Sequence, residues 1–434
     1  MKNDICFRRK MPVATLWLLL GAAFAAKATT AIEANAAVAV NTGEPAAAQI
    51  GVSAQTGVSA QTGVSAQTGV SAQTGVSAQT GVSAQTGVSA QTGVSAQTGA
   101  PYPVQFSVRG QTAPAVIDTE KRSVFVSVPY LSADGSVYPL AAAPVEAFAL
   151  SADAAHTLPP VVDLRKPTFF TITTPAGESV EWYVSGGYQL PDSDFSNWHT
   201  ERVSGFITIG TTECTEMTGT AGQSVWDNGN PAYAASGSKN WPTKRIELAD
   251  GTYAAELTTR SILGIIASGN LFTGRVERDL SLSQLLGFTD KDGKALIDWG
   301  VPFEARPKGF RVKFKYDGKG DSCTIMATLE NRSTGTRRFV GTAWYTGKTD
   351  GDTASEGIVS LSEPDGNGLR TLETAFIYGE PPQNADPLPE GAVQGNAAED
   401  ITHVNVVFAS SARGDYFKGV KGARLIVKDF EFFY

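Results

Sequence analysis

The chain ends in Ser410-Ser411-Ala412-Arg413-Gly414-Asp415-Tyr416-Phe417-Lys418-Gly419, followed closely by Ala423-Arg424-Leu425-Ile426-Val427-Lys428-Asp429-Phe430-Glu431-Phe432-Phe433-Tyr434. The first part is rich in glycine and small polar residues, as loops are. The second part alternates apolar and polar residues and carries several aromatic rings, which is typical of a half-buried strand. A chain that closes on such a strand can pair it back into a sheet. This segment therefore predicts an all-β sandwich.

The same alternation recurs upstream of the closing strand. It is clearest in residues 123–128, 169–174, 181–185, 311–316 and 403–408, with Gly, Pro and Asp turns between them. We predict a small immunoglobulin-like sandwich over residues 101–189, acting as a spacer, and one larger all-β domain over residues 190–434. The short apolar segments from Ile262 to Ala267 and from Leu280 to Leu286 are candidates for local helical turns.

The N-terminus has the pattern of a secretory signal. Lys2, Arg8, Arg9 and Lys10 precede an apolar run over residues 11–26 that is too short to cross a membrane comfortably. Residues 1–28 are therefore predicted to be a signal peptide, leaving no membrane span in the mature chain. We expect export to the periplasm, the cell surface or the medium. No cysteine follows the apolar run, so a lipid anchor is not encoded there.

Charge and cysteine content narrow the class of partner. Removing residues 1–28 changes the formal net charge from −8 to −12, because five Lys or Arg residues and one Asp are lost. Such an acidic product is a poor partner for nucleic acid or anionic lipid. Cys214 and Cys323 remain in the mature chain. We expect two buried thiols, with a disulfide as the alternative in an oxidising compartment.

A low-complexity linker is predicted over residues 29–100. Within it, residues 51–98 repeat the hexapeptide Gly-Val-Ser-Ala-Gln-Thr eight times without deviation. The repeat has no charge and no aromatic ring, so it has little apolar surface to offset the entropy lost on ordering. We predict a disordered stalk, which as a flexible coil would span about 35 to 40 Å. A short β-solenoid is the alternative, because Val and Thr recur at fixed offsets.

Six blocks in residues 195–434 carry a family resemblance. They are Asn197-Trp198, Trp226 to Asn230, Leu257 to Arg260 with Ala267 to Gly274, Gly300 to Phe303 with Arg306 to Phe310, Asp321 to Cys323, and the closing segment. Together they resemble the putative carbohydrate metabolism domain family. The resemblance implies an exported jelly-roll protein of glycan-using Gram-negative bacteria, often with an immunoglobulin-like domain ahead of the jelly roll. The chain departs from the family pattern in two places. It lacks the lipid-anchor cysteine, and it has Lys428-Asp429 where relatives tend to have two acidic residues.

Sugar recognition uses flat aromatic rings against the C–H faces of the sugar, with amides and charges for its hydroxyls. The residues that fit this chemistry in the larger domain are Trp198, Trp226, Asp227, Asn230, Arg260, Asn270, Trp344 and Arg413. Each also has a structural interpretation. A tryptophan in a sandwich is usually packed in the core, and residues 227–230 can form a turn because Asn and Gly tolerate a positive φ.

No metal site or catalytic residue is assigned from the sequence. Residues 290–293 and 317–321 faintly resemble calcium loops but lack the full set of ligands, so calcium stays possible and unassigned. Glycoside hydrolysis requires two carboxylates at a fixed separation. Glu213, Glu216, Glu256 and Asp227 lie in the candidate region, and nothing in the sequence pairs two of them.

The function predicted from the sequence is recognition of a glycan or polysaccharide by an exported jelly roll. A glycoside hydrolase of the same fold is the first alternative, because the candidate region holds several carboxylates. A structural or adhesive surface protein is the second, favoured by the long repeat and the spacer domain.

Overall fold

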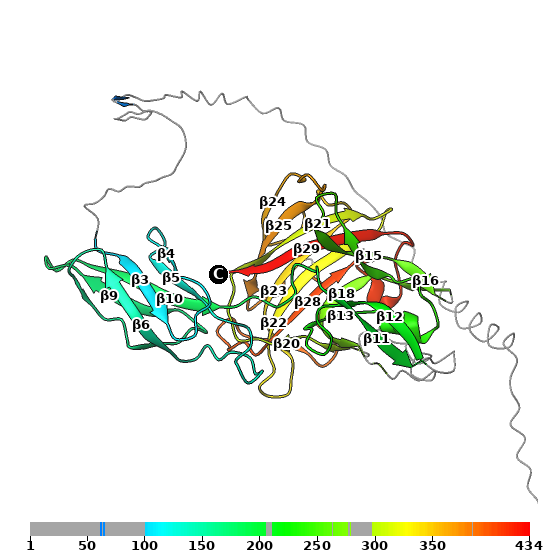
Figure 1. The fold of residues 1–434 in the computed structure, drawn as a ribbon, viewed down its shortest axis with the longest axis horizontal. Helices are drawn as coiled ribbons and strands as arrows, with labels where there is room; N and C mark the ends of the chain where they lie inside the picture. The colour runs from blue at the N-terminus through cyan, green and yellow to red at the C-terminus, as the bar shows by residue number, and fades with distance from the viewer. Residues whose placement is uncertain are drawn as a thin grey trace, which may run out of the picture. The chain divides into compact units, whose positions relative to one another are not determined.

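The computed structural model describes residues 61–62, 64–65, 100–204, 211–262, 264–276, 278, 297–383 and 385–434. Within these ranges the chain is built almost entirely of strands, which confirms the all-β prediction (Figure 1). Residues Thr98–Tyr434 form one compact unit. The signal peptide, nearly all of the linker and residues 280–286 lie outside the described residues. In the repeat only β1 (Gln61–Thr62) and β2 (Val64–Ser65) are described, as an antiparallel pair.

The first part of the compact unit is a small two-sheet sandwich. One sheet has the order β4 (Val116–Asp118), β5 (Ser123–Ser127), β10 (Ser179–Gly187), β9 (Thr168–Thr173) and β7 (Ala155–His156). The other has the order β3 (Pro103–Val108), β6 (Ala143–Leu150) and β8 (Val161–Val162). Alternate residues such as Val124, Val126 and Trp182 are buried between the sheets, as the period of two requires. Its immunoglobulin-like character and the boundary at residue 189 stay predictions.

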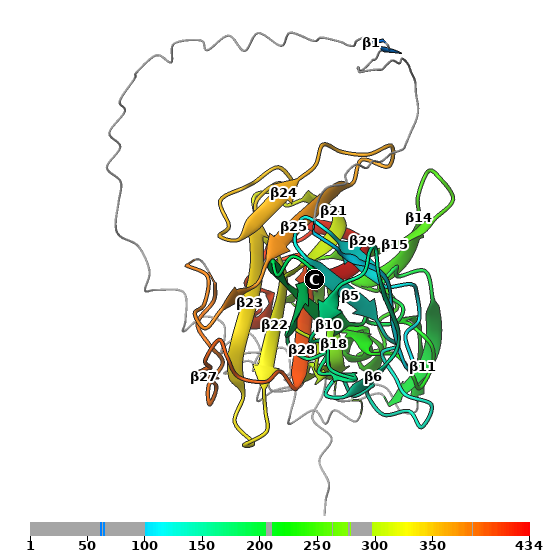
Figure 2. The same cartoon turned by 90° about the vertical axis from the view of Figure 1, so that its left-hand side faces the viewer.

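Two larger sheets form the jelly-roll sandwich. The nine-stranded sheet runs β13 (Trp226–Asn228), β18 (Asn270–Val276), β28 (His403–Ala409), β22 (Cys323–Asn331), β23 (Arg338–Gly347) and β26 (Ile377–Tyr378), flanked by β19 (Ile297–Trp299), β20 (Val301–Pro302) and β27 (Val393–Gln394). The six-stranded sheet runs β14 (Thr243–Glu247), β15 (Tyr253–Thr258), β29 (Arg424–Phe433), β21 (Gly309–Asp317), β25 (Arg370–Ala375) and β24 (Ile358–Leu361). Figure 2 shows β23, β22, β28 and β18 side by side.

The closing strand is β29, as predicted. It lies inside the six-stranded sheet, between β15 and β21, with Leu425 opposite both Leu257 and Tyr316. Leu425, Val427, Phe430 and Phe432 are buried. The last strand of the chain therefore joins segments that are far apart in the sequence.

Short elements decorate the larger sandwich. They are the hairpin of β11 (Trp198–Ser204) and β12 (Thr211–Thr218), α2 (Asn230–Ala235), the hairpin of β16 (Arg260–Ile262) and β17 (Ile265–Ala267), and the single turn η4 (Gly414–Tyr416). The prediction of a helical turn over residues 262–267 was wrong. Gly264 has φ +83°, a left-handed conformation that closes a tight turn and places Ile262 opposite Ile265.

The C-terminal residue binds the larger sandwich to the smaller one. The Tyr434 hydroxyl donates to the carbonyl of Tyr188 at 2.8 Å, and its ring stacks on Phe125 with centroids 4.6 Å apart. A Cβ at Gly187 would lie 2.2 Å from the Tyr434 ring, so only glycine allows this approach. Gln189 extends the contact, since its side chain both donates to and accepts from the backbone of Phe432 at 2.7 Å.

Cys214 and Cys323 are both free and buried, as favoured by the sequence. Burial raises the pKa of the Cys214 thiol to about 12, which leaves it protonated and unreactive near neutral pH. None of the helices in the described ranges has the length and apolar character that crossing a bilayer demands.

Candidate ligand-binding face

The central strand β22 separates two chemically different faces of the nine-stranded sheet. Cys323, Ile325, Ala327 and Leu329 face the six-stranded sheet and belong to the main core. The residues between them, Thr324, Met326, Thr328 and Glu330, must point the other way because side chains alternate along a strand. We call this second side the outer face.

The register of three strands defines a grid on the outer face. Met326 lies opposite Trp344 of β23 on one side and opposite Val407 of β28 on the other. Thr324 is flanked in the same way by Thr346 and Ala409, and Thr328 by Thr342 and Asn405. Strand geometry makes this patch about 13 Å long and about 10 Å wide. The nine residues, which we call the outer-face grid, are Thr324, Met326, Thr328, Thr342, Trp344, Thr346, Asn405, Val407 and Ala409.

Three polar atoms of the grid are buried without a hydrogen-bond partner. They are the Thr324 hydroxyl, the Trp344 indole N–H and the Asn405 amide oxygen, and they come from three adjacent strands. The side chains are nearly inaccessible, with exposed fractions of 5%, 6% and 4%. Leaving a buried polar group unpaired costs about 1–3 kcal/mol. Such groups are rare in native proteins, and a cluster of them marks a place where a ligand or water can supply the bonds.

Apolar side chains flank the grid on the β28 side. Phe272, Val276 and Val407 form a small buried cluster, and Trp299 and Met326 pack against it. The ring of Trp299 lies 5.0 Å from that of Phe272. The outer face therefore combines aromatic surface with hydroxyl, amide and indole groups, the mixture that the sequence predicted for sugar recognition.

One end of the grid is closed by a charged cluster. The Glu330 carboxylate is fully buried and accepts hydrogen bonds from Arg332 at 3.0 Å and from Arg337 at 2.8 Å. Burial alone would raise the pKa of Glu330, but the two arginines outweigh it and hold the pKa below its ordinary value. Glu330 therefore stays ionised at neutral pH and is engaged within the protein.

The structure places the predicted residue Trp226 in the core. Its side chain is 1% exposed, and its ring packs against Phe195, Phe408 and Phe430 at centroid distances of 5.1 to 6.0 Å. Its indole N–H donates to the carbonyl of Pro191 at 2.8 Å. The ring and the indole N–H of Trp226 therefore both make their contacts inside the protein.

Asp227, Asn230 and Asn270 are brought together around the start of α2. Asp227 accepts from the Val276 amide and pairs with Arg278, both at 2.9 Å. The Asn230 side chain donates to two carbonyls and accepts from the Thr243 amide. The Asn270 side chain accepts from the Gly229 amide at 2.8 Å. These bonds join β13, β14 and β18, so the described contacts of all three residues are structural.

The other predicted residues lie apart from this network. The indole of Trp198 donates to the carbonyl of Phe195 at 2.8 Å, and Arg260 donates to that of Trp241 at 3.0 Å. Arg413 is exposed and lies over the Tyr416 ring at 4.9 Å. Of the eight predicted residues, Trp344 alone belongs to the outer-face grid. The ligand roles of the other seven stay predictions.

The carboxylates considered for hydrolysis are each engaged in the fold. Glu213 pairs with Arg202 at 3.5 Å, Glu256 with Lys244 at 3.2 Å and with Arg424, and Asp227 with Arg278. Glu216 accepts from the Arg245 amide at 3.0 Å. Within the described ranges no group of three or more His, Cys, Asp or Glu side chains is arranged to hold a metal ion. Calcium stays a prediction without assigned ligands.

Sequence reasoning missed Thr324, Thr328, Thr342 and Asn405. The signal was present in the alternation of residues 323–330, where every second position is Thr, Met or Glu, and in Asn405 placed between two valines. A polar residue at a strand position looks like ordinary solvent exposure in a sequence. Its lack of a partner becomes visible only when the neighbouring strands are known.

Residues 194–433 match the family model described as the putative carbohydrate metabolism domain. The match covers more than half of the chain and includes the whole outer-face grid. The chain belongs to this family. The resemblance inferred from six sequence blocks is thereby confirmed for the larger domain. No curated protein matches the sequence.

Three solved structures show remote similarity to the chain. A putative glycoside hydrolase from Bacteroides thetaiotaomicron is 19% identical with a TM-score of 0.35, over 79% of this chain and 99% of its own. A putative glycoside hydrolase from Bacteroides vulgatus is 18% identical with a TM-score of 0.36, over 55% and 96%. The family 11 carbohydrate-binding module of a Clostridium thermocellum cellulase is 12% identical with a TM-score of 0.23, over 56% and 92%.

Proposed function

We propose that the protein binds a carbohydrate through the outer-face grid. The observation that carries this proposal is the set of three unpartnered polar atoms on Thr324, Trp344 and Asn405. They offer a hydroxyl, an N–H donor and an amide acceptor, which complement sugar hydroxyls that both donate and accept. The description of the family as a carbohydrate metabolism domain is the reason for proposing a carbohydrate as the ligand.

The ligand is proposed to be a neutral sugar. None of the nine grid residues is charged, and the adjacent Glu330 is neutralised by its arginines. The polar atoms are withdrawn from solvent, so side chains at the face must move aside when a sugar binds. The hydrogen bonds that these groups form with the sugar offset the free energy of that movement, because each group is unpaired in the free protein.

Binding without hydrolysis is the form of the proposal that the geometry favours. A glycosidase needs one carboxylic acid and a second carboxylate flanking the scissile bond. The grid contributes neither, and Glu330 beside it is kept ionised by two arginines. Export of the chain, and action at or beyond the cell envelope, are part of the proposal and rest on the signal-like residues 1–28.

The test is a glycan-array screen of the mature chain with and without calcium, followed by an overnight product assay on each hit. Trp344→Phe removes the indole N–H and keeps an aromatic ring, and Thr324→Val removes the hydroxyl and keeps the shape. We expect each to weaken binding about 10-fold, the loss of roughly one good polar contact. The matched control is Trp241→Phe, at a tryptophan that is not one of the nine grid residues.

Two results would overturn the proposal. One is a folded protein that binds no glycan, which would favour a structural or adhesive role. The other is unchanged binding in both grid variants. Release of reducing sugar from a glycan that binds on the array would show that the protein hydrolyses its ligand. The carboxylates would then be tested as catalytic residues.

A further inference from the structure

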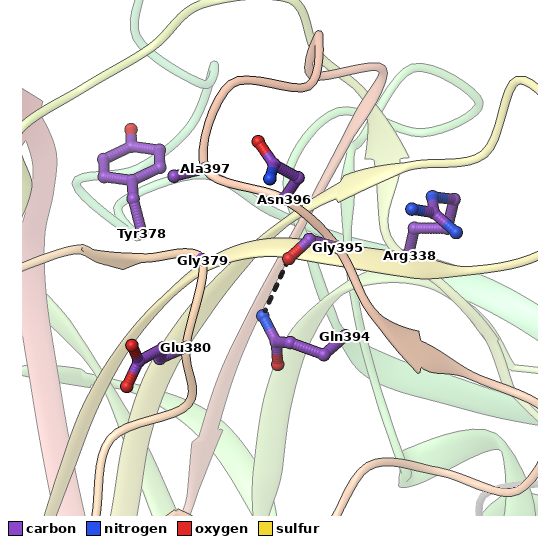
Figure 3. A pocket seen from close by; sticks show the side chains of 8 residues that line it. All are labelled: Arg338, Tyr378, Gly379, Glu380, Gln394, Gly395, Asn396 and Ala397. Carbon is purple, nitrogen blue, oxygen red and sulfur yellow. Dashed lines mark hydrogen bonds between the residues drawn. The ribbon is translucent and has the colours of Figure 1, made fainter.

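A shallow hollow lies at the edge of the nine-stranded sheet. It has a volume of about 420 Å³ and opens widely to solvent. Figure 3 shows the residues around it, which are Arg338, Tyr378, Gly379, Glu380, Gln394, Gly395, Asn396 and Ala397. None of these residues belongs to the outer-face grid.

The hollow arises from the way two short strands meet β23. Strand β26 pairs antiparallel with β23 at Gly341 and Thr342, whereas β27 pairs parallel with it at Arg338 and Phe339. The chain between them leaves a gap along the edge. Gly379 has φ +85°, and a Cβ there would lie 3.0 Å from Ala397, so glycine lets the two sides of the hollow approach.

Gln394 presents an unused acceptor at this hollow. Its side-chain amide donates to the carbonyl of Phe339 at 2.7 Å and to that of Gly395 at 3.5 Å. Those bonds fix the orientation of the amide group. Its carbonyl oxygen is buried and has no hydrogen-bond partner. The oxygen is covered in the structure, so a ligand hydroxyl supplies the missing donor only when a side chain of the lining moves aside.

The rest of the lining suits a sugar ring. Tyr378 contributes its ring to the lining. The Arg306 guanidinium covers one face of that ring at 4.5 Å from the centroid, and the Tyr378 hydroxyl donates to the Pro307 carbonyl at 2.6 Å. Asn396 and Glu380 are exposed at the rim. Flat rings combined with a few placed polar groups are the usual means of holding a sugar.

The charges around the hollow come close to cancelling. Arg338 forms an ion pair with Glu399, and the remaining charged groups are Arg306 and Glu380. A ligand carboxylate or sulfate would meet no uncommitted arginine in the lining itself, and it would approach Glu380. The lining therefore favours an uncharged polyol over an acidic sugar.

From this geometry we infer that the hollow bounded by Arg338, Tyr378, Gln394 and Asn396 is a second binding site, for a neutral monosaccharide or the end of a neutral glycan chain. It shares no residue with the outer-face grid. A protein with two such sites binds a multivalent polysaccharide more tightly than either site does alone, provided that the polymer reaches both.

The experiment is saturation-transfer difference NMR on the mature chain with D-glucose, D-galactose and D-mannose, and with D-glucuronate as the charged comparator. Gln394→Met removes the acceptor and keeps a side chain of similar length. The double variant Glu380→Ala and Asn396→Ala removes the polar groups at the rim and changes no core residue. Gln383→Met and Glu363→Ala are controls at exposed positions outside the lining. Trp344→Phe separates this site from the outer face.

We expect a signal from at least one neutral hexose. Measured in the Trp344→Phe background, where the outer-face grid contributes least, that signal should fall at least about 3-fold in the Gln394 variant and in the rim variant, persist in both controls, and exceed the signal from glucuronate. The inference is overturned if no hexose gives a signal with folded protein, if the signal is unchanged in both site variants, or if only Trp344→Phe removes it. A stronger signal from glucuronate would overturn the assignment to neutral sugars.

Discussion

Trp226 and Trp344 occupy the same sheet and have opposite surroundings. Trp226 of β13 faces the core, where three aromatic rings surround it and a carbonyl accepts its N–H. Trp344 of β23 faces outward, beside Met326, and its N–H has no partner. Both were predicted to bind ligand because polar or aromatic residues adjoin them in the sequence. The difference teaches that strand parity, not local composition, decides which face of the sheet such a residue occupies and whether its polar atom finds a partner there.

The polar neighbours of the two tryptophans differ in the same way. Asn230, near Trp226, has both its donor and its acceptor groups bonded, while the Asn405 oxygen on the outer face has no partner. A satisfied buried amide stabilises the fold, whereas an unsatisfied one costs stability. Four predictions can break or sharpen this comparison.

The largest effect is expected from Trp226→Ala. Removing a buried ring from the aromatic cluster should lower the free energy of unfolding by about 3–5 kcal/mol, measured by urea denaturation. The same change at Trp344 should cost clearly less, since that side chain lies outside the main core. Equal losses at the two positions would show that the outer face is packed like the core.

Asp227→Asn should have the next largest effect. The buried carboxylate pairs with Arg278 and accepts from the Val276 amide, and neutralising it weakens both contacts. Because Arg278 keeps its pair with Glu201 at 2.8 Å, the cost should be about 1–3 kcal/mol. Asp153→Asn, at an exposed position of the small sandwich, is the control. If both variants melt at the wild-type temperature, the contacts around residues 226–230 do not stabilise the fold.

Two Thr→Val changes should have different effects on the free energy of unfolding. The Thr243 hydroxyl donates to the Asn270 carbonyl at 2.7 Å, so Thr243→Val should cost about 1–2 kcal/mol. The Thr324 hydroxyl has no partner, and Thr324→Val should leave stability unchanged or raise it by up to about 1 kcal/mol. Parallel thermal melts measure both. Destabilisation of similar size in the two variants would mean that Thr324 is bonded in solution.

The smallest effect on stability is expected from Trp344→Phe. The change removes an unpartnered donor and keeps most of the ring, so the free energy of unfolding should stay within about 1 kcal/mol of wild type. Glycan affinity, measured by calorimetry on a ligand from the array, should nevertheless fall. A large loss of stability with unchanged affinity would place Trp344 with Trp226 as a packing residue.

Much of the fold could be predicted because it follows from short-range patterns. The alternation of residues 123–128, 311–316 and 403–408 identified strands β5, β21 and β28, and the closing segment identified β29. The segment 262–267 was wrongly expected to be helical, since its apolar run has no clear period and a single glycine reversed the chain. The partner of each strand could not be predicted, because pairing joins residues up to 172 positions apart in β15 and β29, where Ala255 lies opposite Val427.

The sequence by itself determined the strands, the acidic charge, the repeat and the family, since these depend on residue types and their local order. Only the tertiary structure decided which polar residues share a face and which of them lack partners. The register across β28, β22 and β23 places Asn405 beside Thr328 and Trp344 beside Met326, and the hollow at Gln394 exists only where β26 and β27 converge on β23. Hydrogen-bond satisfaction is a property of three-dimensional neighbours, so a linear sequence cannot reveal it.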